Sequence, residues 1–263
     1  MLIVYEHPLS PYAQKVKIAL REKGVEFEAR LPDGIGAGAA QGAFAGASPR
    51  GEVPALVDGD VKVFDSTIIL EYIEDKWPTP PMLPASPAER ARVRMIEEVV
   101  DTHVEAISWG LAELTWFRRA EGVLAETIRA NAKVQIEGYL AWLERELGDR
   151  PWFNGESFGW GDLSVVPFVN GFLGFGHPPE KGSKLSDWLG RANARPSVAK
   201  AAGEARSFNT AMTDVAGLVD QGLFKREYRD HRLEWMIKSG GMEVVLKGLE
   251  RDNIRFTPVL GQS

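Results

Sequence analysis

The sequence predicts two domains, a small α/β domain followed by an all-helical one. In the first 77 residues, strand-like and helix-like runs follow in the order strand, helix, strand, strand, strand, helix. A proline-rich run then interrupts every regular pattern, and apolar residues beyond it recur at helical spacing. We therefore place the α/β domain at 1–77, a linker at 78–85 and a helical domain with an extended C-terminal tail at 86–263.

The first domain opens as a βαβ unit. Leu2 to Tyr5 is a short apolar run typical of a buried strand. Ser10 and Pro11 have the order of an N-cap and a first helical residue, and Gly24 suits the end of that helix. A strand at 26–31 follows, so the two strands are expected to be parallel.

A hairpin and a helix complete this domain. Residues 32–48 are rich in Gly and Ala and predict a mobile loop with one weak helix at most. Strands at 53–58 and 61–64 flank a tight turn, and a helix follows over 66–76. This order predicts a small sheet with an antiparallel edge.

The second domain begins with a helix-start pattern. Ser86, Pro87 and Glu89 combine an N-cap, a first-turn proline and a capping-box acid, and predict one long helix to about residue 117. Further helices are expected near 125–147, 160–174, 184–193 and 196–212, with one or two more in the tail at 222–250.

Composition argues against several classes of protein. The chain has 263 residues and a net charge of −6 with no basic stripe, which argues against a nucleic-acid partner. It has no cysteine, so disulfides, thiolate metal sites and cysteine nucleophiles are excluded, and its four histidines are too dispersed for a metal motif. No signal peptide or membrane span is evident. We expect a cytoplasmic protein without a metal or a membrane partner.

Five motifs in a fixed order carry a resemblance to a known family. They are Ser10-Pro11-Tyr12 with Lys15-Val16, Ser48 to Leu56, Asp65-Ser66 with Ile68 to Tyr72, Gly155 to Asp162, and Trp188 with Arg191 and Ala194 to Pro196. Over residues 1 to about 212 the chain resembles cytosolic glutathione transferases, most closely serine-type, bacterial-like ones. The resemblance implies a thioredoxin-like α/β N-terminal domain and an all-α C-terminal helical bundle, the glutathione transferase fold.

Two features depart from the family pattern. Gly159 stands three residues before Asp162, where the family has the Ser or Thr of an N-capping box, so a folding element loses its side-chain acceptor. The tail after about residue 222 also exceeds the usual pattern, and the resemblance assigns it no role.

Ser10 is the candidate catalytic residue. A hydroxyl donor at a helix N-terminus, where free N–H groups favour anions, stabilises a thiolate, which is the reactive form of glutathione. Serine here donates a hydrogen bond and is not itself the nucleophile. A plain helix cap is the structural alternative, and Tyr5 and Tyr12 are competing hydroxyl donors.

The resemblance also implies the glutathione contacts. Val53-Pro54 resembles the cis-proline element of thioredoxin-like folds, which frees the backbone of Val53 to pair with the cysteinyl part of the tripeptide. Ser66 can hold the γ-glutamyl carboxylate at the start of a helix, and Asp65 the ammonium. Glu52 is a further contact.

The second substrate is expected between the domains. The aromatic candidates for its pocket are Tyr12, Trp109, Trp116 and Phe117, although core packing is the common role of such residues. Asp101 fits a solvated helical face, with a reach across a dimer to the glutathione ammonium as the alternative.

These residues predict a glutathione S-transferase that activates the thiol for attack on a hydrophobic electrophile, as in detoxification. Glutathione would be a co-substrate, and a homodimer is expected from the resemblance. One alternative is a glutathione-dependent lyase that cleaves ethers in aromatic catabolism. The other is a non-catalytic binding protein with the same fold.

Overall fold

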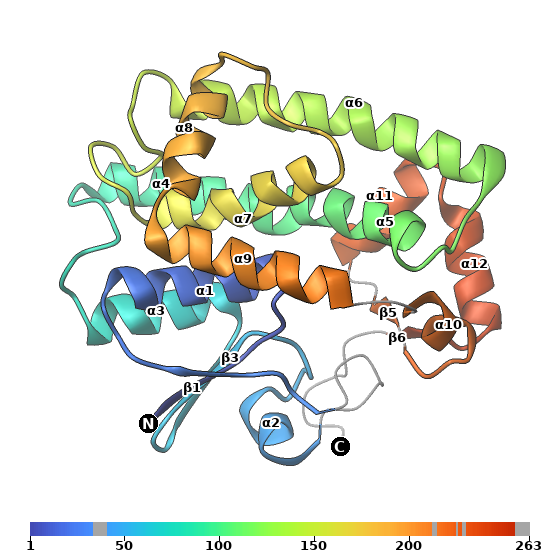
Figure 1. The fold of residues 1–263 in the computed structure, drawn as a ribbon, viewed down its shortest axis with the longest axis horizontal. Helices are drawn as coiled ribbons and strands as arrows, with labels where there is room; N and C mark the ends of the chain where they lie inside the picture. The colour runs from blue at the N-terminus through green and yellow to red at the C-terminus, as the bar shows by residue number, and fades with distance from the viewer. Residues whose placement is uncertain (34–40, 212–214, 225, 228–229, 256–263) are drawn as a thin grey trace.

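The computed structural model describes residues 1–33, 41–211, 215–224, 226–227 and 230–255. Figure 1 shows a small sheet with its helices lying beneath a larger helical domain. The predicted loop at 32–48 falls partly outside the described residues, as does part of the tail.

A four-stranded sheet organises the first domain. Its strands are β1 (Leu2–Tyr5), β2 (Glu28–Arg30), β3 (Ala55–Asp58) and β4 (Val61–Phe64). They lie in the order β2-β1-β3-β4, with β1 and β2 parallel and the other pairs antiparallel. The predicted βαβ unit and antiparallel edge are therefore confirmed.

Helices cover both faces of the sheet. They are α1 (Pro11–Glu22), α2 (Gly42–Ala47) and α3 (Ser66–Lys76). On one face Val16 and Leu20 of α1 and Ile69 of α3 pack on the sheet, and on the other Phe44 of α2 packs against Tyr5. Burial of both apolar faces is what holds so small a sheet together.

The second domain is a helical bundle. Its elements are α4 (Pro87–Val99), the π-helical turn η1 (Val100–Val104), α5 (Glu105–Thr115), α6 (Gly122–Leu147), α7 (Trp160–Gly174), α8 (Lys184–Asn193) and α9 (Pro196–Ala211). The predicted fold class is confirmed. The expected single helix to about residue 117 is two α-helices joined by η1, a local widening that apolar periodicity does not reveal.

Beyond α9, the described residues include three more helices and a short strand pair, of which α11 and α12 lie in the tail. These are α10 (Val215–Asp220), α11 (Asp230–Lys238) and α12 (Met242–Glu250), with β5 (Arg226–Glu227) parallel to β6 (Ile254–Arg255). Figure 1 shows α11 and α12 beside the ends of α5 and α6. None of the helices in the described ranges has the length and low polarity needed to cross a membrane.

Asp162 organises the start of the buried helix α7. Its carboxylate accepts hydrogen bonds from the backbone N–H groups of Phe153 (2.8 Å) and Gly159 (3.1 Å) and from Nε1 of Trp188 (2.8 Å). A Cβ at Gly159 would overlap the carbonyl oxygen of Met82 and a neighbouring side chain. Close packing therefore explains why glycine replaces the family's serine or threonine here, and Asp162 keeps its half of the capping box.

A buried lysine joins the two domains. Lys17 on α1 lies 2.9 Å from Glu6 at the end of β1 and 2.8 Å from Glu204 on α9, and its own side chain is fully buried. Arg21, one turn further along α1, also pairs with Glu204 at 2.5 Å. This pairing sets how α1 meets the helical domain, because a buried charge without its partner is costly.

Candidate functional site

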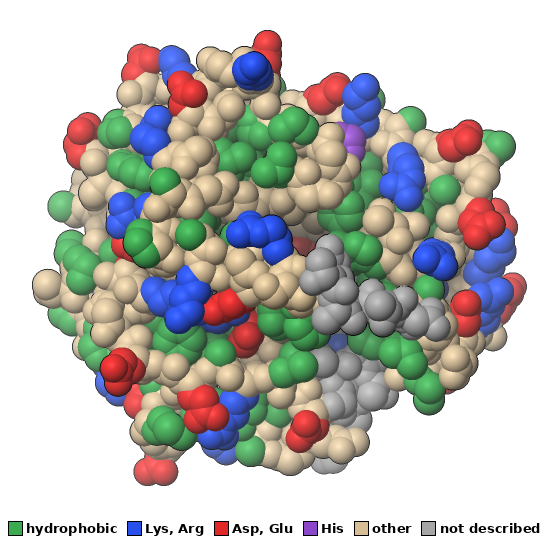
Figure 2. All heavy atoms as spheres, viewed as in Figure 1, with side chains coloured by type: hydrophobic (Ala, Val, Ile, Leu, Met, Phe, Trp, Pro, Cys, Tyr) green, Lys and Arg blue, Asp and Glu red, His purple; other side chains and the backbone are tan. Residues whose placement is uncertain are grey.

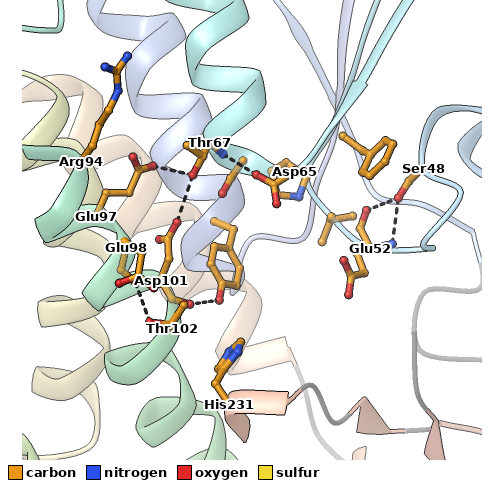
Figure 3. Close-up of a pocket in the computed structure, with 15 residues that line it drawn as sticks. Ser48, Glu52, Asp65, Thr67, Arg94, Glu97, Glu98, Asp101, Thr102 and His231 are labelled. Atoms are coloured by element: carbon orange, nitrogen blue, oxygen red, sulfur yellow. Dashed lines mark hydrogen bonds between the residues drawn. The ribbon is translucent and has the colours of Figure 1, made fainter. Parts of the chain in front are cut away.

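A cavity of about 310 Å³ lies where the sheet domain meets α4 and η1 (Figure 3). Its lining residues are Tyr12, Ser48, Glu52, Val53, Pro54, Phe64, Asp65, Ser66, Thr67, Arg94, Glu97, Glu98, Asp101, Thr102 and His231. All of the predicted glutathione contacts line it: Glu52, Val53, Pro54, Asp65 and Ser66. The fold thus brings two motifs from the sequence into one site.

The start of β3 forms one wall. The Val53–Pro54 peptide bond is cis. The preceding turn is held by Ser48, whose hydroxyl donates to the carbonyl oxygen of Glu52 (2.8 Å) and accepts from its N–H (3.1 Å). Glu52 also pairs with Arg50 at 2.9 Å. The backbone beside Pro54 is therefore presented to the cavity by a well-bonded turn.

The N-terminus of α3 forms the next wall. Asp65 has a φ of 73°, an uncommon left-handed conformation for a residue other than glycine. Its carboxylate caps the helix by accepting from the N–H groups of Thr67 (3.0 Å) and Ile68 (3.4 Å). Ser66 follows as the first helical residue and is buried. Helix start and serine together form a place suited to a carboxylate.

Ser10 stands at the N-terminus of α1 and is half-buried. Its Oγ accepts a hydrogen bond from the N–H of Ala13 at 3.3 Å, which leaves its O–H free to donate. Ser10 is not among the residues that line the cavity, although Tyr12, two positions later, is. One hydroxyl can accept the capping hydrogen bond and donate another at the same time, so the cap does not exclude the catalytic role. That role of Ser10 stays a prediction.

The two tyrosines that compete with Ser10 for the donor role both make contacts within the protein. Tyr5 is buried in the core, with its ring 5.4 Å from that of Phe44. The Tyr12 hydroxyl donates to the backbone carbonyl of Asp101 at 2.5 Å.

A buried ionic cluster, which the sequence analysis missed, lies behind the start of α3. Nζ of Lys15 lies 2.6 Å from Glu97 and 2.5 Å from Asp101, and the Thr67 hydroxyl donates to Glu97 at 3.0 Å. Trp160 also donates to Glu97, at 2.5 Å. Glu97 and Asp101 are four residues apart, a spacing that puts both on one helical face, but only the tertiary structure shows that Lys15 lies opposite them.

The cluster perturbs the ionisation of Asp101. Burial raises the pKa of Asp101 to about 7, with a further contribution from Glu97, while Lys15 opposes the shift. Its Oδ1 is buried and makes no hydrogen bond within the described part of the chain. Asp101 is therefore not the solvated helical acid that we expected, but part of the cavity wall.

The four aromatic residues predicted for the second-substrate pocket do not all line the cavity. Tyr12 lines the cavity, whereas Trp109, Trp116 and Phe117 do not. Trp109 lies under the Arg232 guanidinium at 5.2 Å, and Phe117 stacks on Phe224 at 5.7 Å. Residues of the tail thus cover two of these aromatics, a contact between distant segments that helical spacing alone does not reveal.

No group of three or more side chains suited to hold a metal ion occurs among the described residues.

Comparisons with known proteins match both domains. The glutathione S-transferase N-terminal domain model matches residues 4–81, and the C-terminal domain model matches residues 115–191. Glutathione S-transferase U25 of Arabidopsis thaliana is 32% identical, over 73% of this chain and 84% of its own. Glutathione S-transferase U28 of the same plant is also 32% identical, over 65% and 72%. The chain belongs to the glutathione S-transferase family.

Solved structures of glutathione S-transferases resemble it in the same way. Rice GST1, OsGSTU1, solved in complex with glutathione, is 28% identical, covering 80% of this chain and 97% of its own, with a TM-score of 0.64. A glutathione S-transferase from Rhodospirillum rubrum F11 is 26% identical, covering 76% and 91%, with a TM-score of 0.66. The helices of our chain that follow α9 lie outside the residues that either domain model matches.

Proposed function

We propose that this glutathione S-transferase ionises the thiol of glutathione and transfers the tripeptide to a hydrophobic electrophile. One observation carries the proposal: the start of β3 and the N-terminus of α3, which the β3–β4 hairpin separates in the sequence, meet with α4 and η1 of the helical domain in one cavity whose size suits a small ligand. The family's named members support the same activity.

The cavity groups suggest how the tripeptide would bind. The γ-glutamyl carboxylate would meet the Ser66 hydroxyl at the N-terminus of α3, and Asp65, whose Oδ1 caps that helix, would take the ammonium. Oδ1 of Asp101, which no other described residue engages, supplies a second acceptor in the same cavity. The cysteinyl backbone would pair with Val53.

The chemistry follows from Ser10. Its O–H donates to the sulfur and lowers the cost of the thiolate, and the N-terminus of α1 adds a favourable field. The thiolate then attacks an electrophilic carbon, and a halide, an alkoxide or a conjugated double bond accepts the electrons. Glutathione is thus a co-substrate, and no step needs a metal.

Glutathione binding and thiol ionisation together test the proposal. The protein should be retained on immobilised glutathione, and the bound thiol should show the ultraviolet absorbance of a thiolate near neutral pH. Binding without a thiolate band would favour a non-catalytic binding protein. Products released from aryl ethers, without conjugation of halides, would favour the lyase. Failure to bind glutathione would contradict every one of these functions.

We also propose a cytoplasmic homodimer, an expectation supported by family membership. Sedimentation velocity would show a single species of twice the chain mass, and a monomer would contradict the proposal of a homodimer.

The surface of one face mixes acidic and basic side chains without a basic stripe (Figure 2), in keeping with a small-molecule partner.

A further inference from the structure

The tail brings to the cavity a titratable side chain that the proposed function does not use. His231 lies in the first turn of α11 and lines the cavity together with Tyr12 and Thr102. Figure 3 shows Ser48 and Glu52 at the right of the view and Thr102 at the left, with Asp65 near the top of the cavity and His231 below it. Glutathione held by Val53 and Ser66 therefore leaves the His231 side for the second substrate.

Contacts made by the residues that follow it on α11 hold His231 in place. Arg232 makes a two-pronged pair with Glu105 on α5, at 2.6 Å and 3.2 Å, and both side chains are buried. Trp235 donates to Gln135 at 2.7 Å, and its ring fills the space over Gly110, where a Cβ would overlap it. These contacts dock α11 on the helical domain through buried side chains.

The imidazole of His231 is oriented by the same carboxylate. Its Nε2 is buried and lies 3.5 Å from Oε2 of Glu105, an ion-pair distance rather than a good hydrogen bond. Its Nδ1 makes no hydrogen bond with the described residues. With Nε2 buried beside the Glu105 carboxylate, Nδ1 is the ring nitrogen left to exchange a proton with a substrate.

The hydroxyls that share the cavity are mostly engaged. Those of Ser48, Thr67, Thr102 and Tyr12 donate to protein oxygens at 2.8, 3.0, 2.7 and 2.5 Å. The Ser66 hydroxyl, which makes no hydrogen bond with the described residues, belongs to the glutathione side, and Arg94 is paired with Glu71 at 2.5 Å. Asp101, whose raised pKa also lets it carry a proton, faces the glutathione ammonium under the proposed function. Among the described lining residues on the second-substrate side, His231 is therefore the group that can deliver a proton.

We propose that His231 is the proton donor for substrates that develop negative charge on oxygen, specifically α,β-unsaturated carbonyl compounds. The inference rests on the proposed function. The glutathione thiolate forms the S–C bond to the β-carbon, and the C=C electron pair moves to give an enolate. The N–H bond of the imidazolium breaks as the enolate oxygen takes the proton. The enol then tautomerises in water, and the imidazole regains a proton from solvent, into which the thiol had released one.

Two electrophiles that share a phenyl ring separate this role from a structural one. With 4-phenylbut-3-en-2-one the product needs a proton, whereas benzyl chloride loses chloride without one. In His231→Gln, kcat for the enone should fall by about 10²-fold, the usual scale of general acid catalysis, while kcat for benzyl chloride changes less than about twofold. His231→Phe serves as a second variant, and His177→Phe, in the loop after α7, is the matched control.

The outcomes are distinct. Equal losses with both electrophiles would show that His231 only supports the fold or the pocket, and unchanged enone turnover would show that it donates no proton; either result overturns the inference but leaves the proposed function. If the wild-type protein binds glutathione but conjugates neither compound, the proposed function and the inference fail together. Thermal melting of each variant checks that α11 remains docked.

Discussion

At the scale of single residues, Ser10 shows how one hydroxyl can serve both folding and chemistry. Its oxygen accepts from the N–H of Ala13 and caps α1, and its hydrogen remains to stabilise a thiolate. The two roles act on different quantities. The cap contributes to the free energy of unfolding, whereas the donated hydrogen bond contributes to the transition state.

Replacement of Ser10 by alanine should separate the two roles. We expect turnover to fall by roughly 10- to 1000-fold, because a charge-stabilising donor is lost, with glutathione affinity nearly unchanged. Steady-state kinetics and fluorescence titration measure the two effects. Ser183→Ala is the matched control, since Ser183 caps α8 in the same way, with Ser186 N–H at 3.1 Å. Both variants should lose about 1 kcal/mol of stability, but only Ser10→Ala should lose activity. Unchanged turnover would move the catalytic role to another hydroxyl.

At the scale of elements, tertiary packing decided features that local patterns left open. At the start of α7, glycine stands where the capping box has a serine or threonine, because the carbonyl of Met82 and the side chain of Asn154 occupy the space of a Cβ. At the start of α11, the Arg232–Glu105 pair docks the tail onto α5. Both elements depend on contacts with distant segments.

Substitution of Gly159 by alanine tests the first of these. The added methyl group has no room, so we expect a loss of roughly 1–3 kcal/mol in the free energy of unfolding, measured by urea denaturation. Gly138→Ala is the matched control. Gly138 lies within α6 with open space around it, so alanine should stabilise the protein by up to about 1 kcal/mol. Equal effects of the two substitutions would contradict the packing argument.

Docking of the tail should depend on acid pH through Glu105. Burial alone raises the pKa of Glu105, but Arg232 and His231 outweigh it and lower the pKa to about 2, from an ordinary value of 4.5. A depressed pKa in the folded state means that ionised Glu105 contributes stability above about pH 4.5, and that this contribution disappears as pH falls toward 2. The contribution amounts to about 3 kcal/mol.

The measurement compares wild type with Glu105→Gln from pH 7 to pH 2. The wild type should be more stable near neutral pH, and the difference should shrink between pH 4.5 and pH 2, because the variant lacks the titrating group. A difference that stays constant over this interval would show that Glu105 has an ordinary pKa. Urea denaturation at each pH gives the two free energies of unfolding that are compared.

At the scale of the whole molecule, buried lysines on α1 connect the two domains. Lys15 meets α4 and η1 behind the cavity, and Lys17 meets α9 on the other side of the helix. Both side chains are fully buried among carboxylates. The position of the sheet domain relative to the helical domain, and hence the width of the cavity, depends on these pairs.

Removal of the Lys17 charge should weaken the whole assembly. Lys17→Met leaves Glu6 buried without its partner, so we expect a loss of about 3–5 kcal/mol in the free energy of unfolding. Thermal and urea denaturation measure it. Lys133→Met is the control, because Lys133 is exposed and lies 3.9 Å from Glu137, where such pairs contribute about 0.5 kcal/mol or less. Comparable effects at the two positions would contradict the role of Lys17 in joining the domains.

Local patterns were enough to predict much of this fold and part of its site. The strand at Leu2–Tyr5, the helix after Ser10 and the helix that begins at Ser66 depend on apolar periodicity and on caps, which act over a few residues. The predicted glutathione contacts lie directly at the ends of such elements. Once the order of elements was known, their meeting at one cavity followed from the fold.

The remaining features were decided only by tertiary structure. The ionic cluster around Lys15 joins segments far apart in sequence, and so does the cover that Phe224 and Arg232 place over Phe117 and Trp109. The π-turn at Val100–Val104 is a local change of helix geometry that apolar spacing does not reveal. Local residue patterns specify which short elements form and what chemistry they can carry. Which side chains share the cavity depended on the packing of those elements, because burial and charge pairing act between neighbours in space and not between neighbours in the chain.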